Sequence, residues 1–118
     1  MQMPERVVHL ELHTGDLARA WTFYARLFDW TLENVRSEAG AYLASSLGGG
    51  LGGGAVECGV GRPRWLPYVE VDEIRSMTGR AVRLGAEVIL APREGPAGWR
   101  SVVTAPAGGE IALWQPKR

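Results

Sequence analysis

The chain is poor in cysteine and carries no excess of charge of either sign. One cysteine, Cys58, stands in 118 residues, and thirteen basic residues balance thirteen acidic ones. A single cysteine excludes an intrachain disulfide framework and is typical of the reducing cytoplasm, where we expect this protein. We interpret Cys58 as a small apolar core residue, not as a nucleophile. No basic run exceeds the final Lys-Arg pair, so nucleic acid is not an expected partner.

Long apolar runs are also missing. No run approaches the ~18 residues that suggest a membrane-spanning helix, and the first eight residues lack the apolar centre of a signal peptide. We therefore expect no membrane partner. The composition, 46% hydrophobic and 22% charged, predicts one globular domain over residues 1–118 with a core of its own.

The hydrophobic pattern predicts the same order of elements twice. Residues 6–13 alternate apolar and polar side chains, as in a half-buried strand, and Asp16 is placed to cap the helix that follows. Gly85 is placed to end a second helix. The predicted elements are strand 6–13, helix 16–30, strands 30–35, 41–47 and 54–60, then strand 65–71, helix 72–85 and strands 86–92, 99–105 and 110–116. This order indicates an α+β protein of two modules, residues 6–60 and 64–116.

Three stretches carry a resemblance to a known family. They are HLELHTGDLARAWTFYARLFDW, YVEVDEIRSMTGRAVRLGAEVILAP and TAPAGGEIALWQP. In order and spacing they resemble the vicinal oxygen chelate superfamily, which includes glyoxalase I, bleomycin-resistance proteins and extradiol dioxygenases. The resemblance covers residues 6–116. It implies a glyoxalase-like fold, in which two βαβββ modules form a cupped sheet or open barrel with the binding site inside. It also implies a homodimer.

The same resemblance implies four metal ligands in the metal-dependent members of the superfamily. The corresponding positions here are His9, Glu57, Leu66 and Ala112. Leucine and alanine have no donor atom, and a catalytic divalent ion needs about three protein ligands. We therefore expect no metal cofactor, with His9 and Glu57 as the weak candidates if a divalent ion does bind.

His9, Glu11 and His13 alternate along the first predicted strand, so their side chains point the same way. Three such residues span ~13 Å along a strand and cannot together reach one ion whose bonds are ~2.1 Å long. A carboxylate at hydrogen-bonding distance would instead favour the charged imidazole and fix its tautomer. His9 and Glu11 are the candidate catalytic residues, and proton transfer in an isomerase or lyase step is the chemistry they would perform.

Other residues are predicted to line the same cup as ligand-binding side chains. Pairing of the modules places Tyr68, Glu70 and Trp114 on the face of His9, with Val69, Val71 and Leu113 behind it. Trp99 is expected near the pocket mouth, and Trp21, Trp30 and Trp65 are assigned to packing. The full set of candidate ligand-binding residues is His13, Tyr42, Glu57, Tyr68, Glu70, Trp99 and Trp114.

The leading hypothesis is a small-molecule-binding protein of the glyoxalase/bleomycin-resistance type without a complete conventional metal site. Flat aromatic ligands would stack on Tyr42, Trp99 and Trp114. The alternatives are a metal-free isomerase or lyase and a metal-dependent lyase or dioxygenase, so the sequence leaves open whether the chain is an enzyme. The run GGGLGGG, residues 48–54, lacks the ending of a phosphate-binding loop and is predicted to be a flexible hairpin.

Overall fold

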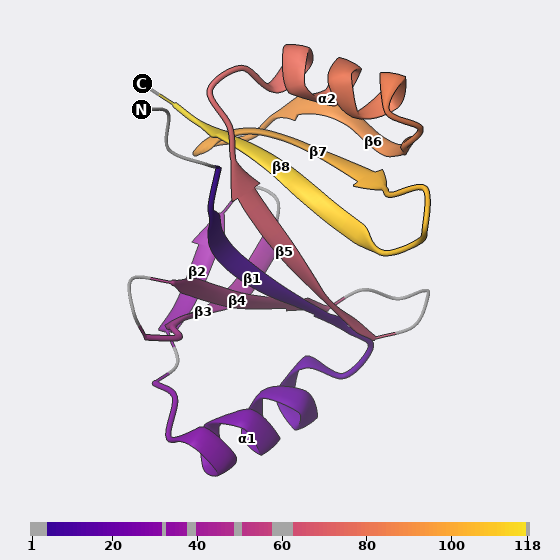
Figure 1. Cartoon of the computed structure of the whole chain (residues 1–118). Coiled ribbons are helices and arrows are strands. Elements are labelled where there is room, and N and C mark those ends of the chain that lie inside the picture. Colours follow the sequence, from indigo (N-terminus) through magenta and orange to yellow (C-terminus); the bar gives the residue numbers. More distant parts are fainter. Residues whose placement is uncertain (1–4, 32, 38–39, 49–50, 58–62, 118) are drawn as a thin grey trace. The chain divides into compact units, whose positions relative to one another are not determined.

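A computed structural model describes residues 5–31, 33–37, 40–48, 51–57 and 63–117, without the side chains of 34–43. It confirms the mixed α+β class and the predicted order of elements (Figure 1). The elements are β1 (Val7–Thr14), α1 (Leu17–Phe28), β2 (Glu33–Ser37), β3 (Gly40–Ser46), β4 (Gly52–Glu57), β5 (Arg64–Glu70), α2 (Ile74–Arg83), β6 (Glu87–Glu94), β7 (Gly98–Thr104) and β8 (Glu110–Pro116). Two compact units divide the chain: an N-terminal unit, His9–Leu66, and a C-terminal unit, Met1–Val8 with Pro67–Arg118.

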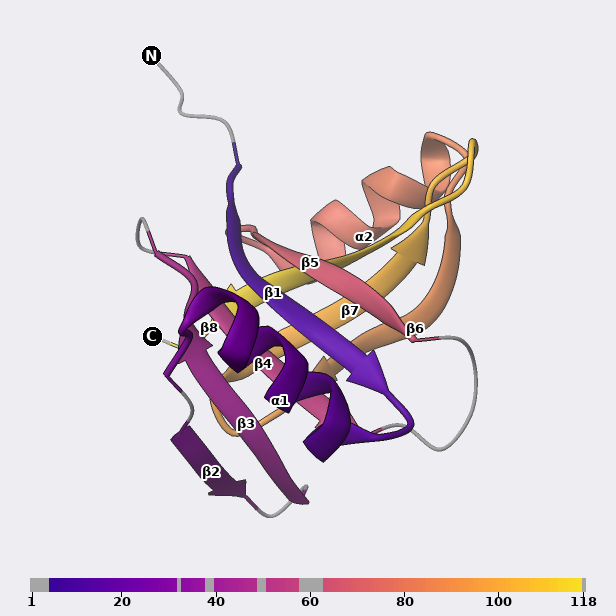
Figure 2. The same ribbon diagram turned by 90° about the horizontal axis from the view of Figure 1, so that it is seen from below.

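In the N-terminal unit the strands lie in the order β2-β3-β4-β1. β1 runs parallel to β4, and the other pairs are antiparallel. Helix α1 covers one face of these strands (Figure 2). Leu12 and Trp21 form the core of that face with Ala55, and Trp30 and Trp65 pack against it. This packing confirms both the predicted inward direction of Leu12 and the structural role of the three tryptophans.

The two ends of α1 have local causes. Asp16 Oδ1 accepts a hydrogen bond from the main-chain N–H of Arg19 at 3.1 Å, which confirms the predicted cap. The helix was expected to reach Trp30 but ends at Phe28, because Asp29 adopts a left-handed conformation with φ 57°. The final turn leaves Leu27 and Phe28 more than half exposed.

In the C-terminal unit the strands lie in the order β5-β8-β7-β6, with β5 and β8 parallel. Helix α2 packs on β6, β7 and β8, and Val71, Ile74 and Leu113 form the core between them. The hydroxyls of Thr78 and Ser101 are buried and lie 2.8 Å apart, which satisfies both across the helix–sheet interface. Gly85 follows α2 with φ 102°, as predicted.

The glycine run is not a hairpin throughout. Gly48 and Leu51 form a turn, but Gly52–Gly54 lie inside β4. The expectation of a flexible loop over all of 48–54 was therefore wrong. It failed because a glycine-rich strand has no side-chain alternation by which it can be recognised.

None of the helices in the described part of the chain is long and apolar enough to cross a membrane. Cys58 lies outside the described residues, so its predicted burial stays a prediction.

Candidate functional site

The two histidines of the chain flank one carboxylate on β1. His13 Nε2 lies 2.7 Å from Glu11 Oε1, and His9 Nε2 lies 3.7 Å from Glu11 Oε2. All three side chains are half-buried, with 28% of His9, 16% of Glu11 and 15% of His13 exposed. Since a carboxylate only accepts, His13 Nε2 carries the proton in the shorter contact. The structure thus brings the predicted His–Glu–His row together around Glu11.

Beside His9 and Glu11 the sheet face is almost bare, whereas His13 pairs with Val56. Strand register pairs His9 with Gly52 and Glu11 with Gly54 on β4. On the next strand, Ala44 pairs with Gly54 and Ser46 with Gly52, so the residues opposite these two glycines are small. A paired residue shares the face of its partner, so the glycines leave backbone uncovered next to the histidines.

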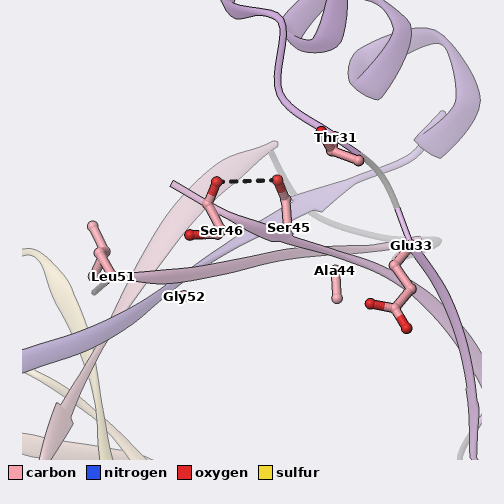
Figure 3. A pocket seen from close by; sticks show the side chains of 7 residues that line it. All are labelled: Thr31, Glu33, Ala44, Ser45, Ser46, Leu51 and Gly52. Atoms are coloured by element: carbon pink, nitrogen blue, oxygen red, sulfur yellow. Dashed lines mark hydrogen bonds between the residues drawn. The ribbon is translucent and has the colours of Figure 1, made fainter. Parts of the chain in front are cut away.

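An open hollow of about 420 Å³ lies at this bare part of the N-terminal unit. Figure 3 shows the acidic side chain of Glu33 and the hydroxyls of Thr31 and Ser46 around it. Gly52, the register partner of His9, is part of its wall. The complete lining is Thr31, Glu33, Ala44, Ser45, Ser46, Leu51 and Gly52.

Glu57 does not face the histidines. It pairs with Thr14 on the opposite face of the sheet, and its Oε1 accepts a hydrogen bond from the main-chain N–H of Leu17 at 3.1 Å. A carboxylate at the start of a helix is stabilised by the unpaired N–H groups and by the helix dipole. The prediction that Glu57 shares a ligand site with His9 was therefore wrong, because β4 pairs one residue out of the register assumed.

The donor set implied by the family does not fit a metal ion in this chain. Of its four positions, Leu66 and Ala112 are buried and apolar, and Glu57 faces away from His9. Within the described ranges, no three His, Cys, Asp or Glu side chains are grouped so that they could hold a metal ion.

A second polar face lies in the C-terminal unit, on the side of the sheet away from α2. Tyr68 OH accepts a hydrogen bond from Arg100 Nη1 at 3.2 Å. The rings of Tyr68 and Trp114 meet edge to face, with centroids 6.4 Å apart. Trp114 pairs with Glu70 on one side and with Arg100 on the other. Tyr68, Glu70 and Trp114 thus share a face, as predicted.

Arg100 is a member of this face that the sequence analysis missed. One arginine in a strand of seven residues gives no signal of its own. Its pairing with Trp114 places it on this face, but that pairing requires the register of β7 against β8, which the sequence does not give.

Trp99 lies on the other face of the same strand. It packs against the Val71–Ile74–Leu113 core, and the guanidinium of Arg75 lies 5.3 Å from the centroid of its ring. The expectation that Trp99 and Trp114 line one pocket was therefore wrong, since neighbouring residues of a strand point to opposite faces.

Two predicted relationships stay predictions. Tyr42 lies on β3, but its side chain is outside the described part of the structure. Tyr68 and Glu70 belong to the C-terminal unit and the His–Glu–His row to the N-terminal unit, so each face is described by itself.

Two modules of strand, helix and three strands define a protein of the glyoxalase-like fold class. A family model described as a glyoxalase-like domain matches residues 7–114, nearly the whole chain. The chain belongs to this glyoxalase-like family.

Relatives and solved structures agree with this assignment. CFP32 of Mycobacterium tuberculosis, which is named as a glyoxylase, is 29% identical over 117 residues, covering 92% of this chain and 45% of that protein. The chain therefore spans about half the length of this relative. Methylmalonyl-CoA epimerase from M. tuberculosis has the same fold with a TM-score of 0.70, at 15% identity over 95% of this chain and 88% of that one.

A third similar protein comes from Vibrio splendidus 12B01 and is described as a glyoxalase/bleomycin resistance protein/dioxygenase superfamily member. It has a TM-score of 0.66 at 17% identity, covering 95% of this chain and 99% of that one. At such identities the two structural likenesses establish the fold.

Proposed function

We propose that this protein binds a small organic molecule on the face that carries the His–Glu–His row and transfers a proton to or from it. The observation that carries this proposal is the half-buried Glu11 carboxylate, 2.7 Å from His13 and 3.7 Å from His9. An imidazole on either side of a carboxylate suits general acid–base catalysis.

The proposed roles follow from these distances. Glu11 is the base that takes a proton from carbon next to a carbonyl group. His9 is the second catalytic group, since it lies beside Glu11 Oε2 and pairs with Gly52, which lines the hollow. His13 is a positioning residue, because its hydrogen bond to Oε1 fixes the carboxylate. Return of the proton to carbon completes an isomerisation, and loss of a leaving group completes a lyase step.

We propose that this chemistry runs without a resident metal ion. The support is the chemistry of the donor set, since two of the four implied positions are apolar and a third holds the start of α1. Removal of metal by a chelator should leave the rate of proton exchange unchanged.

Relatives suggest where the substrate search should begin. One structural neighbour is named as an epimerase of a CoA thioester, and CFP32 is named as a glyoxylase. Epimerisation next to a carbonyl requires removal and return of a proton. Acyl-CoA thioesters with an acidic α-hydrogen are therefore the first compounds to test, followed by small α-hydroxy and α-oxo carbonyl compounds.

A second candidate function is ligand sequestration without turnover. The edge-to-face pair of Tyr68 and Trp114 favours it, because such a pair offers an aromatic surface to a flat ligand. Tight binding with no chemical change in any compound tested would support this function and exclude the first.

The first function is tested by deuterium uptake in D₂O, followed by proton NMR over the compound panel. With an accepted substrate, Glu11→Gln should lower the exchange rate about 10²–10⁴-fold, the usual contribution of a general base. His9→Ala should lower it as well. Full exchange by both variants would exclude the assigned roles.

The role of His13 needs a different readout. His13→Ala frees the carboxylate, so kcat should fall while KM changes little. His13→Gln can still donate to Glu11 and should recover part of the loss. Equal losses in the two variants, with unfolding midpoints matching the wild type, would contradict a positioning role.

We also propose a homodimer located in the cytoplasm. The support for the dimer is the exposed apolar surface of α1, which carries Phe23, Leu27 and Phe28. The single cysteine favours a reducing compartment.

A further inference from the structure

Two arginines face each other across neighbouring strands of the C-terminal unit. Arg93 on β6 pairs directly with Arg100 on β7, and Arg100 pairs with Trp114 on β8. Directly opposed side chains have Cβ atoms about 4.5–5.5 Å apart, and like charges in such a pair destabilise a sheet. The pairing of Arg93 with Arg100 therefore has an electrostatic cost.

The sheet itself does not offset this cost. In the part of the chain that the structure describes, neither arginine forms an ion pair. The nearest acidic residue in the same row is Glu70, which pairs with Trp114 and so stands two strands from Arg100, roughly 10 Å away. Glu94 follows Arg93 directly but pairs with Trp99, on the other face, and contacts Lys117 at 3.7 Å.

Arg100 is nevertheless held in place. Its Nη1 donates to Tyr68 OH at 3.2 Å, and the Tyr68 side chain is buried. Trp114 stands beside it on the neighbouring strand. Gly98, two residues before Arg100, allows β8 to approach closely, since a Cβ there would lie 2.3 Å from Gln115 O and 3.0 Å from Trp114 Cη2. A fixed guanidinium next to an aromatic ring is a preorganised site.

We infer that this arginine face binds a small organic anion: a planar carboxylate joined to a flat apolar group. The carboxylate lies between Arg93 and Arg100, where a guanidinium can bind both oxygens at once and the repulsion between the arginines is relieved. The flat group packs on Trp114. This inference stands on residues other than those of the proposed proton transfer.

Benzoate is a suitable probe, because it combines both features in one small molecule. Titration of the full chain is followed by the indole N–H signal of Trp114 in ¹H–¹⁵N NMR spectra, assigned with Trp114→Phe. Arg100→Ala should weaken benzoate binding at least about tenfold, as expected for loss of a charge-assisted pair. Arg93→Ala, at the more exposed position, should weaken it by a smaller factor.

The matched control is Arg75→Ala. Arg75 is an exposed arginine of the same unit that lies over Trp99, on the opposite face. Its removal should leave benzoate binding unchanged. Benzamide, the neutral analogue, should bind at least about tenfold more weakly than benzoate.

Three results would overturn the inference. The first is unchanged benzoate binding by Arg100→Ala with a native spectrum. The second is an equal loss in Arg75→Ala, which would mean attraction to net charge alone. The third is competition by inorganic phosphate at the same concentration as benzoate, which would mean that the site selects charge without the flat group.

Discussion

Glu57 pairs with Thr14 at the end of β1, and its carboxylate accepts the main-chain N–H of Leu17 at 3.1 Å. Its position in the sequence suggested a metal ligand, but its hydrogen bond shows that it stabilises the start of helix α1. The difference between these two roles is a single residue of register, because a shift by one moves a side chain to the other face of a sheet.

A substitution at this residue separates the two roles. Glu57→Ala should lower the free energy of unfolding by about 1 kcal/mol, since a helix N-terminus loses its acceptor. Urea unfolding measures this change, and Asp16→Ala at the same helix end is the control of similar size. A variant of unchanged stability that had lost proton exchange would contradict the structural role.

For single residues, the face on which a side chain lies was predictable where it depends only on the alternation within one strand. Leu12 alternates with the histidines of β1, so its burial against Trp21 followed from period two. Arg100 and Trp99 could not be placed in the same way. Their faces depend on the pairing of β7 with β8, which is a relation between strands and leaves no mark within either of them.

Strand β4 is the element that its sequence predicts least well, because its glycines give no alternating pattern. It nevertheless forms part of the candidate site. Gly52 lines the hollow beside His9, whereas Gly53 points to the α1 side. A Cβ on Gly53 would lie 2.6 Å from the Leu47 side chain. The missing side chain at Gly52 therefore leaves the hollow open, whereas the missing side chain at Gly53 makes room for Leu47.

Valine substitutions at these two glycines should have opposite effects. Gly52→Val should fill part of the hollow and weaken ligand binding, with little loss of stability, since valine suits a strand. Gly53→Val should displace Leu47 and cost about 1–3 kcal/mol, the usual price of overpacking. Thermal unfolding and ligand titration of both variants measure the contrast. Equal effects on binding would contradict the assigned faces.

The elements were largely predictable from sequence, and their ends less so. β8 was predicted at its observed bounds, and the cap at Asp16 was correct. Helix α1 stopped two residues early because Asp29 turned left-handed, a conformation more usual for glycine. The glycine run was assigned to a loop since propensity disfavours glycine in strands, and pairing with β1 and β3 overrode that preference.

At the scale of the whole molecule, the repeated order of strand, helix and three strands was visible in the sequence and led to the family. Each unit has an apolar face under its helix and a polar face opposite. The polar faces carry different chemistry, a His–Glu–His row in one unit and paired arginines with two aromatic rings in the other. One repeated fold thus holds two chemically distinct surfaces.

The proposed dimer concerns the molecule as a whole and is tested by its mass in solution. Size-exclusion chromatography with light scattering should give twice the chain mass of 12.8 kDa. Exposed Phe23, Leu27 and Phe28 on α1 offer apolar area for an interface. A mass of one chain at high micromolar concentration would contradict the dimer.

The central claim is that Glu11, held between two histidines, moves a proton without a metal ion. This proton transfer is tested by the rate of deuterium uptake into an accepted substrate. The rate is measured with chelator-treated wild-type protein and with chelator-treated Glu11→Gln. We expect full exchange by the wild type and a loss of at least about a hundredfold in the variant. Exchange that disappears from the wild type on chelation, or that persists in the variant, would contradict it.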